Sequence, residues 1–264
     1  FANINAIPDV DREKRTVFFN VTVDPGRRAY VRRINISGNA RSRDEVVRRE
    51  LRQFESAWYD TDKIRLSRER LTRLGYFTNV TIDTVPVPEA PDQVDLNVNV
   101  TERSTGTFLI GVGFSSTDKL ILTASVNQQN FLGTGKSIGL NMNTGRTQRQ
   151  ITLSSTDPYF TPDGISRSFD VFTRRFNASA LGLGDYVIET QGLGMLFGIP
   201  YTEVDRVTFG LAYERNNLSL GANPPARYRE YVDTFGESSW AALGQIGWFR
   251  DERDSPLTPT RGLY

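Results

Sequence analysis

The sequence contains neither cysteine nor histidine among its 264 residues. Without cysteine, disulfide cross-links and thiolate chemistry are excluded, and without histidine the usual zinc sites and a histidine general base are excluded too. The 32 basic and 31 acidic residues leave a formal net charge of +1, so the chain lacks the global positive field of a nucleic-acid binder. These absences argue against a zinc- or histidine-dependent enzyme and against nucleic acid as a partner.

Long apolar runs are absent as well. No stretch approaches the roughly 18 apolar residues that a transmembrane helix requires, because Gly or Asn interrupts the longest ones. The chain opens at Phe1 without the basic and apolar segments of a signal peptide. Both ends resemble the interior of a domain, so we expect the chain to be a piece of a longer polypeptide.

The second half of the chain repeats short turns flanked by aromatic residues, which alternate with polar hairpins. The turns lie at residues 130–135, 157–164, 198–203 and 255–262. Between a turn and the next hairpin lie about ten residues in which apolar and polar side chains alternate, the period of a strand whose faces meet different solvents. This pattern is typical of a transmembrane β-barrel.

We predict about eight such antiparallel strands in residues 104–264, where charge falls and Gly, Asn and aromatic residues rise. The hairpins after the odd-numbered strands are polar or long, with the longest at residues 219–238, whereas the other ends carry aromatic residues. Short turns with an interfacial aromatic belt are typical of the periplasmic side. Tyr264 would begin a ninth strand, so we expect half of a larger barrel.

Residues 27–103 predict a complete α+β domain with the element order βααββ. Its strands are expected at residues 29–37, 77–85 and 94–101. Pro86, Pro88 and Pro91 are expected to keep the connection between the last two strands in an exposed loop outside the sheet.

Two helices are predicted between the first and second strands of this domain. The first is expected to open with a capping box formed by Ser42 and Glu45. The second is expected over residues 62–74, with Asp60 or Thr61 as its N-cap.

Residues 1–26 are predicted to be the C-terminal hairpin of a preceding domain. Residues 8–11 carry turn chemistry between two extended runs, and Asp24-Pro25-Gly26 breaks the chain. The domain boundaries are therefore placed after residues 26 and 103.

Several residues of the βααββ domain permit a functional and a purely structural interpretation. The arginine pairs, among them Arg48 and Arg49, either form a docking face or are solvated surface. Glu55, Trp58 and Tyr59, in the loop between the helices, either anchor a partner or cover the small core.

The first strand of the predicted barrel has an unusual composition for a strand that must close a seam. Gly111 and Gly113 remove side chains and stiffness from it. Since an unpaired backbone group in hydrocarbon costs on the order of several kcal/mol, we interpret the weak seam as a place where another strand pairs. The structural alternative is a bend or a crowded lumen. The predicted pairing residues are Thr107, Phe108, Leu109, Ile110, Gly111, Val112, Gly113 and Phe114.

Several long motifs resemble the last POTRA domain and the first half of the barrel in the BamA family. They are VRRINISGN at residues 31–39, RDEVVRRELR at 43–52, RLTRLGYF at 70–77, NFLGTG at 130–135 and DPYFTPDG at 157–164. The resemblance covers essentially the whole chain. It implies that residues 1–26 end the preceding POTRA domain and that the strands are about eight of sixteen.

Members of that family are the central subunits of the machinery that folds and inserts β-barrel proteins into the outer membrane of Gram-negative bacteria, without cofactor, nucleotide or metal. The resemblance implies a non-enzymatic insertase in the outer membrane, with its POTRA domains in the periplasm. Its partners would be unfolded outer-membrane proteins, accessory lipoproteins and outer-membrane lipid. Residues 107–114 occupy the position of the family's lateral gate, and POTRA domains bind clients by β-augmentation.

The resemblance also assigns Glu55 to the loop on which accessory lipoproteins dock. We predict a docking surface made of Glu55, Arg48, Arg49 and Arg52. The main alternative is a related POTRA-barrel transporter for two-partner secretion or autotransporter assembly. A passive porin would need no βααββ domain, and an outer-membrane enzyme would need a catalytic constellation that a chain without histidine does not offer.

Overall fold

The computed structural model describes residues 3–11, 16–24, 28–253 and 260–262. The chain divides into two compact units, Phe1–Ser104 and Thr105–Tyr264. None of the helices in these described ranges is long and apolar enough to cross a bilayer. The break predicted at Pro25-Gly26, most of the turn predicted at residues 255–262 and the ninth strand predicted at Tyr264 lie outside the described residues.

The first unit begins with an antiparallel hairpin of β1 (Asn3–Asp11) and β2 (Thr16–Asp24). The prediction of a turn at residues 8–11 is wrong, because these residues continue β1 and Pro8 lies opposite Phe19. In a two-stranded ribbon both strands are edges, so a proline that lacks an N–H donor is tolerated there.

The rest of the first unit is a three-stranded sheet with two helices, and it confirms the predicted βααββ order. The elements are β3 (Tyr30–Ser37), α1 (Asp44–Arg48), α2 (Thr61–Arg73), β4 (Phe77–Val87) and β5 (Ala90–Glu102). The spatial order is β3-β5-β4, with β3 parallel and β4 antiparallel to the central β5. Alternate residues of β5 form the centre of the core, as predicted for Val94, Leu96, Val98 and Val100, all at most 5% exposed.

The proline prediction is partly wrong, because β4 and β5 extend further than expected. Pro86 lies within β4 opposite Val94, and Pro91 lies within β5, so only Pro88 remains in the turn. β4 is an edge strand. Pro86, which lacks an N–H donor, is tolerated there because its nitrogen can face away from the hydrogen bonds of the sheet.

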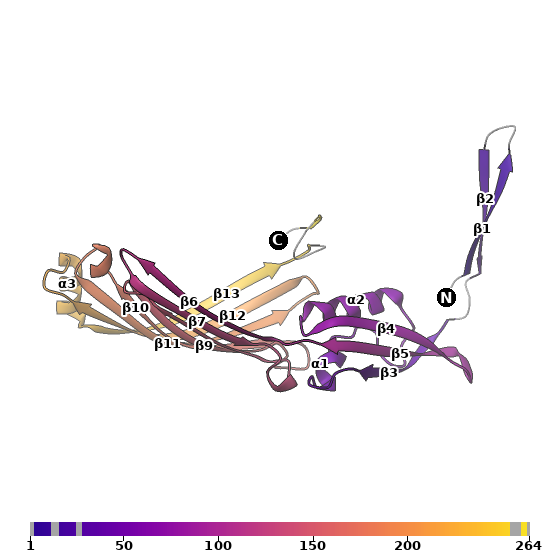
Figure 1. The fold of residues 1–264 in the computed structure, drawn as a ribbon, viewed down its shortest axis with the longest axis horizontal. Coiled ribbons are helices and arrows are strands. Elements are labelled where there is room, and N and C mark those ends of the chain that lie inside the picture. Colours follow the sequence, from indigo (N-terminus) through magenta and orange to yellow (C-terminus); the bar gives the residue numbers. More distant parts are fainter. Residues whose placement is uncertain (1–2, 12–15, 25–27, 254–259, 263–264) are drawn as a thin grey trace. The chain divides into compact units, whose positions relative to one another are not determined.

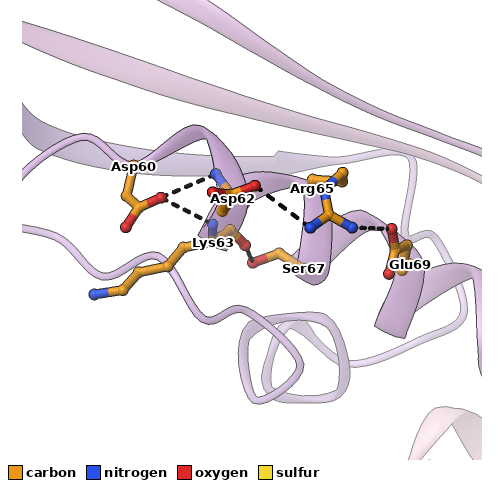
Figure 2. Close-up of polar contacts among 6 residues, drawn as sticks. All are labelled: Asp60, Asp62, Lys63, Arg65, Ser67 and Glu69. Atoms are coloured by element: carbon orange, nitrogen blue, oxygen red, sulfur yellow. Dashed lines mark hydrogen bonds and ion pairs between the residues drawn. The ribbon is translucent and has the colours of Figure 1, made fainter. Parts of the chain in front are cut away.

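The two helices begin in different ways. The predicted capping box is wrong, because α1 starts after Arg43 without a side-chain cap, and the amides of Arg41 and Ser42 donate instead to the Glu102 carboxylate at 2.9 and 2.6 Å. For α2 the prediction is confirmed. The Asp60 carboxylate accepts hydrogen bonds from the amides of Asp62 and Lys63 at 2.9 and 3.2 Å (Figure 2).

The second unit confirms the prediction of eight antiparallel strands. They are β6 (Gly106–Ser115), β7 (Lys119–Gln128), β8 (Ser137–Thr144), β9 (Gln148–Asp157), β10 (Ser166–Asn177), β11 (Tyr186–Pro200), β12 (Asp205–Leu220) and β13 (Ser238–Arg250). Each strand pairs with the next one in the chain, so β6 and β13 are the two edges of a single sheet (Figure 1).

The two faces of this sheet differ in polarity. One row of directly paired residues across seven strands is Phe108, Val126, Leu140, Leu153, Val171, Leu193 and Tyr213. A row on the other face is Gly111, Thr123, Asn143, Gln150, Arg174, Thr190 and Asn216. The period of two along each strand therefore separates an apolar face from a polar face, as the alternating sequence predicts.

The hairpin between β12 and β13 contains a helix that the sequence analysis did not anticipate, α3 (Ala226–Phe235). Its Tyr228 and Val232 pack on a small cluster at the ends of β10–β12 that includes Tyr186. The spacing of Tyr228 and Val232, Pro225 before the helix and Gly236 after it were readable helix signals. They lay unused inside a segment interpreted as a polar hairpin.

We predict that Asp60→Ala lowers the unfolding free energy of the βααββ domain by about 1 kcal/mol, because two amide donors at the start of α2 lose their acceptor. Urea denaturation of residues 28–103 measures this loss. The matched control is Asp62→Ala, which removes an exposed ion pair to Arg65 (Figure 2) and is expected to cost less than about 0.5 kcal/mol. Equal losses for the two variants would contradict the assignment of Asp60 as the cap.

Candidate strand-pairing edge and docking surface

The predicted pairing residues 107–114 all lie in the edge strand β6. On one side β6 pairs with β7 without a break, from Gly106 opposite Gln128 to Ser115 opposite Lys119. On the other side no strand in the described part of the chain pairs with it. Ten consecutive residues thus present one row of backbone donors and acceptors that this sheet leaves open.

Within β6 four apolar side chains extend from one face, whereas Gly111 and Gly113 lie on the other face together with Leu109. Phe108, Ile110, Val112 and Phe114 are each at least 64% exposed on the apolar face. Gly111 stands where a Cβ atom would come 2.5 Å from the hydroxyl oxygen of Thr123.

At Gly113 the nearest atom to a built Cβ, the Cβ of Ile121, is 3.8 Å away, an ordinary contact. Only Gly111 is therefore required by a close neighbour, which agrees with the crowded-lumen interpretation at that position. At Gly113 no close contact explains why the residue is a glycine.

The start of β6 is fastened to β7 by side chains as well as by the backbone ladder. The Thr105 hydroxyl donates to the carbonyl of Gln129 at 2.6 Å, and the Gln128 side-chain amide donates to the Thr105 hydroxyl at 2.7 Å. The Gln129 amide donates to the Thr105 carbonyl at 3.2 Å. The edge strand is thus anchored where it follows the first unit.

The far end of the β6–β7 hairpin is held differently. The backbone ladder between β7 and β8 ends at Thr123 opposite Asn143, so the first part of β7, residues 119–122, extends beyond it. There the carboxylate of Asp118, in the β6–β7 turn, accepts hydrogen bonds from the amide of Thr147 at 2.8 Å and from its hydroxyl. These bonds lower the pKa of Asp118. A single carboxylate therefore connects the turn of the edge hairpin to the β8–β9 turn.

The docking residues lie in the first unit and only partly come together. Glu55 and Arg48 form an exposed ion pair, with 3.7 Å between Oε1 and Nη1. Arg48 also donates to Asp44 at 2.9 Å, which is the main cause that raises its pKa. Arg49 and Arg52 are half-buried, and the Arg52 guanidinium donates to the Arg49 carbonyl at 3.4 Å. The predicted surface is therefore smaller, and centred on Glu55 and Arg48.

Glu55 also has a structural role that the sequence analysis did not foresee. Its carboxylate accepts a hydrogen bond from the backbone amide of Ile34 in β3 at 2.8 Å. The neighbouring loop residues continue along the same strand, because the amide of Ser56 donates to the carbonyl of Val31 and the amide of Val31 donates to the carbonyl of Ala57. The loop between the helices thus covers part of the open edge of β3.

Trp58 and Tyr59 in this loop have different roles, because Tyr59 covers the core and Trp58 is available to anchor a partner. Tyr59 packs against the core, and its hydroxyl accepts a hydrogen bond from Thr84 at 3.3 Å. Trp58 is 47% exposed and stacks on Tyr30 with 4.0 Å between ring centroids, while the Arg28 guanidinium lies 5.3 Å from the Trp58 ring. Tyr30 and Arg28 extend the exposed surface, and the sequence analysis missed this contribution.

Two family models match the chain in the order of its two units. A POTRA model, described as surface antigen variable number repeat, matches residues 29–103. The Omp85 superfamily domain matches residues 130–264, about half of the chain.

Individual relatives agree with these matches. Over 99% of its length the chain is 42% identical to the outer membrane protein assembly factor BamA of Neisseria meningitidis, and it spans 34% of that protein. The solved structure of BamA from Haemophilus ducreyi lacking POTRA domains 1–3 matches 99% of the chain with a TM-score of 0.77 and 32% identity, over 52% of that chain. CdiB from Escherichia coli shares the fold alone, at a TM-score of 0.54 and 15% identity over 95% of this chain and 46% of its own.

We predict opposite responses of Gly111 and Gly113 to alanine. Gly113→Ala slows amide hydrogen exchange in β6 about threefold, because it removes backbone freedom where a methyl group fits. Gly111→Ala speeds exchange, because the new methyl group displaces the Thr123 hydroxyl, which donates to the Gly111 carbonyl. Exchange is read by mass spectrometry on the full-length protein. The same change in both variants would show that the contact with Thr123 does not distinguish the two positions.

We also predict that acid releases the turn of the edge hairpin. Because the folded pKa of Asp118 is lowered, its bonds stabilise the turn above the unfolded pKa of about 3.9 and are lost as pH falls through the folded value. Spin labels at Thr117 and Arg146 should give a narrow distance distribution at neutral pH and a broad one in acid. In the Asp118→Ala variant the distance distribution should be broad at both pH values. A distribution in the unsubstituted protein that stays narrow in acid would contradict the role of Asp118.

Proposed function

Since the chain belongs to the Omp85 superfamily, we propose that it forms part of an outer-membrane protein assembly factor that folds and inserts β-barrel proteins. In this proposal residues 104–264 are half of a barrel of about sixteen strands in the outer membrane. Residues 27–103 are the last POTRA domain, in the periplasm, and residues 1–26 end the domain before it. The similarity to BamA of Neisseria meningitidis supports the proposal.

The observation that carries the proposal is the open edge of β6. A strand edge in hydrocarbon leaves amide and carbonyl groups without hydrogen bonds, at a cost on the order of several kcal/mol. An incoming client strand that pairs with residues 107–114 satisfies these groups and its own. The edge therefore acts as a template, and this is the role that the lateral gate has in the proposal.

This activity requires neither a cofactor nor a covalent step. The free energy that drives insertion comes from backbone hydrogen bonds and from the transfer of apolar side chains out of water. Such side chains lie on the client strand and on the apolar face of β6. The protein contributes a pairing edge at the correct depth and a locally disturbed bilayer. It lowers the barrier to insertion and leaves the folded client as the product.

Partners follow from the two surfaces. Unfolded outer-membrane proteins pair with β6, and accessory lipoproteins dock on the surface around Glu55 and Arg48. Trp58 follows Glu55 in the loop between the helices, and its exposed stack on Tyr30 supplies the large apolar contact that is typical of docking sites.

The direct test is the folding rate of a model outer-membrane barrel into liposomes that carry the complete parent protein. Empty liposomes and liposomes with a porin are the controls. A rate clearly above both controls is the expected result. No acceleration, together with export of one dedicated substrate, would overturn the proposal in favour of the related transporters.

We predict that Glu55→Gln weakens binding of the accessory lipoproteins about tenfold, because it removes the charge while the amide oxygen still accepts from Ile34. Glu55→Lys removes both and should also loosen the loop on β3. Binding is measured by surface plasmon resonance, and folding by circular dichroism. Glu89→Gln, in the exposed β4–β5 turn, is the control and should bind normally. Unchanged binding by Glu55→Gln would exclude the charge of Glu55 from docking.

A further inference from the structure

Three arginines interrupt the apolar face of the eight-stranded sheet at the end that carries the long hairpins. They are Arg149 in β9, Arg175 in β10 and Arg215 in β12, here called the arginine band. Arg175 is four residues from Val171, and Arg149 is two residues from Ile151, so both emerge on the apolar face. The same period places Arg215 there. All three are exposed.

The charges of the band are not balanced within the chain. Arg149 and Arg175 are direct cross-strand partners, and like charges in that position destabilise a sheet. Glu189 lies on the other side of Arg175, with 3.5 Å between Oε1 and Nε. No acidic side chain among the described residues pairs with Arg149 or Arg215. Of the three guanidinium groups, only that of Arg175 has a carboxylate partner among the described residues.

Two cations at the opposite end of the strands have carboxylate partners. Lys136, beside β8, lies 3.0 Å from a carboxylate oxygen of Asp157. Arg250, at the end of β13, lies 3.7 Å from a carboxylate oxygen of Asp205. Arg167, on the same face at that end, has Asp157 as its cross-strand partner, whereas in the arginine band Arg149 lies opposite Arg175.

Aromatic rings mark the depth of the band in a membrane. Tyr213 and Trp240 stack with 5.3 Å between their centroids, and the Arg215 guanidinium lies 5.4 Å from the Trp240 ring. Tyrosine and tryptophan side chains gather at the boundary between hydrocarbon and headgroups, and arginine extends its charged group toward the headgroups. The band therefore lies at the depth of lipid phosphates.

We propose that the arginine band binds the phosphate groups of anionic lipids in the outer leaflet of the membrane. The proposal rests on the proposed function in one respect, namely that this sheet spans an outer membrane with its hairpin end outward. A guanidinium group forms two parallel hydrogen bonds with a phosphate, and a bound phosphate also removes the repulsion between Arg149 and Arg175. The bound lipid thus attaches to the apolar face of the sheet across β9 to β12.

Binding of diphosphoryl lipid A by the purified full-length protein in detergent tests this proposal, with native mass spectrometry to count bound lipid. The triple variant Arg149→Gln, Arg175→Gln and Arg215→Gln is expected to raise the apparent Kd at least about tenfold. The corresponding triple Arg→Lys variant keeps the charge but loses the paired hydrogen bonds, so its Kd should lie between those of the unsubstituted protein and the triple Gln variant. If the triple Gln variant does not fold, Arg149→Gln alone is measured, with an expected rise of about threefold.

Arg174→Gln is the matched control, because Arg174 is adjacent to Arg175 in sequence but extends from the polar face. Its affinity should be unchanged, and lipid A without phosphates should not bind any variant. An unchanged Kd in the triple Gln variant, or equal weakening by Arg174→Gln, would overturn the proposal. Displacement of the lipid by an equal concentration of inorganic phosphate would identify a free-anion site instead. The assay contains no client, so its outcome is separate from that of the insertion assay.

Discussion

Backbone hydrogen bonding is the constraint on which the rest of this structure depends. A strand needs partners on both sides, and in hydrocarbon water cannot replace a missing one. In the second unit the six strands β7 to β12 each pair with a neighbour on both sides. The two edge strands of the described sheet, β6 and β13, each pair on one side. The apolar and polar faces, the short turns and the side-chain bonds at the hairpins all belong to one sheet whose strands pair in chain order from β6 to β13.

The two units treat an open strand edge in opposite ways. In the βααββ unit, part of the β3 edge is covered by the loop between the helices, and the Glu55 carboxylate binds the amide of Ile34. At β6 nothing in the described chain covers the edge, although Thr105 and Asp118 fasten the two ends of the hairpin. The open edges of β6 and β13 in the described sheet thus contrast with the partly covered edge of β3.

Periodicity predicted most of the fold, because alternation along a strand and core-facing residues such as Val98 are local properties of the sequence. The predictions failed where a distant partner decides the local structure. Ser42 could cap α1 by its type, but Glu102, some sixty residues away, takes its amide. Pro86 is excluded from central strands by its type, but the sheet order makes β4 an edge.

The candidate sites also combine features that local sequence predicted with features that depend on contacts between distant residues. The composition of residues 107–114 indicated a weak seam, and the structure adds that the contact with Thr123 concerns Gly111 alone. The bond from Glu55 to Ile34 and the stack of Trp58 on Tyr30 depend on tertiary contacts, so spacing in the sequence could not indicate them.

The central claim is that a client strand pairs with the open edge of β6, residue by residue. Because the sequence contains no cysteine, single cysteines at residues 107–114 can be tested against single cysteines along the terminal strand of a stalled client. The account predicts disulfides in one continuous register, in which each step along β6 moves the cross-link one step along the client. Cross-links scattered without a register, or confined to residues outside β6, would contradict it.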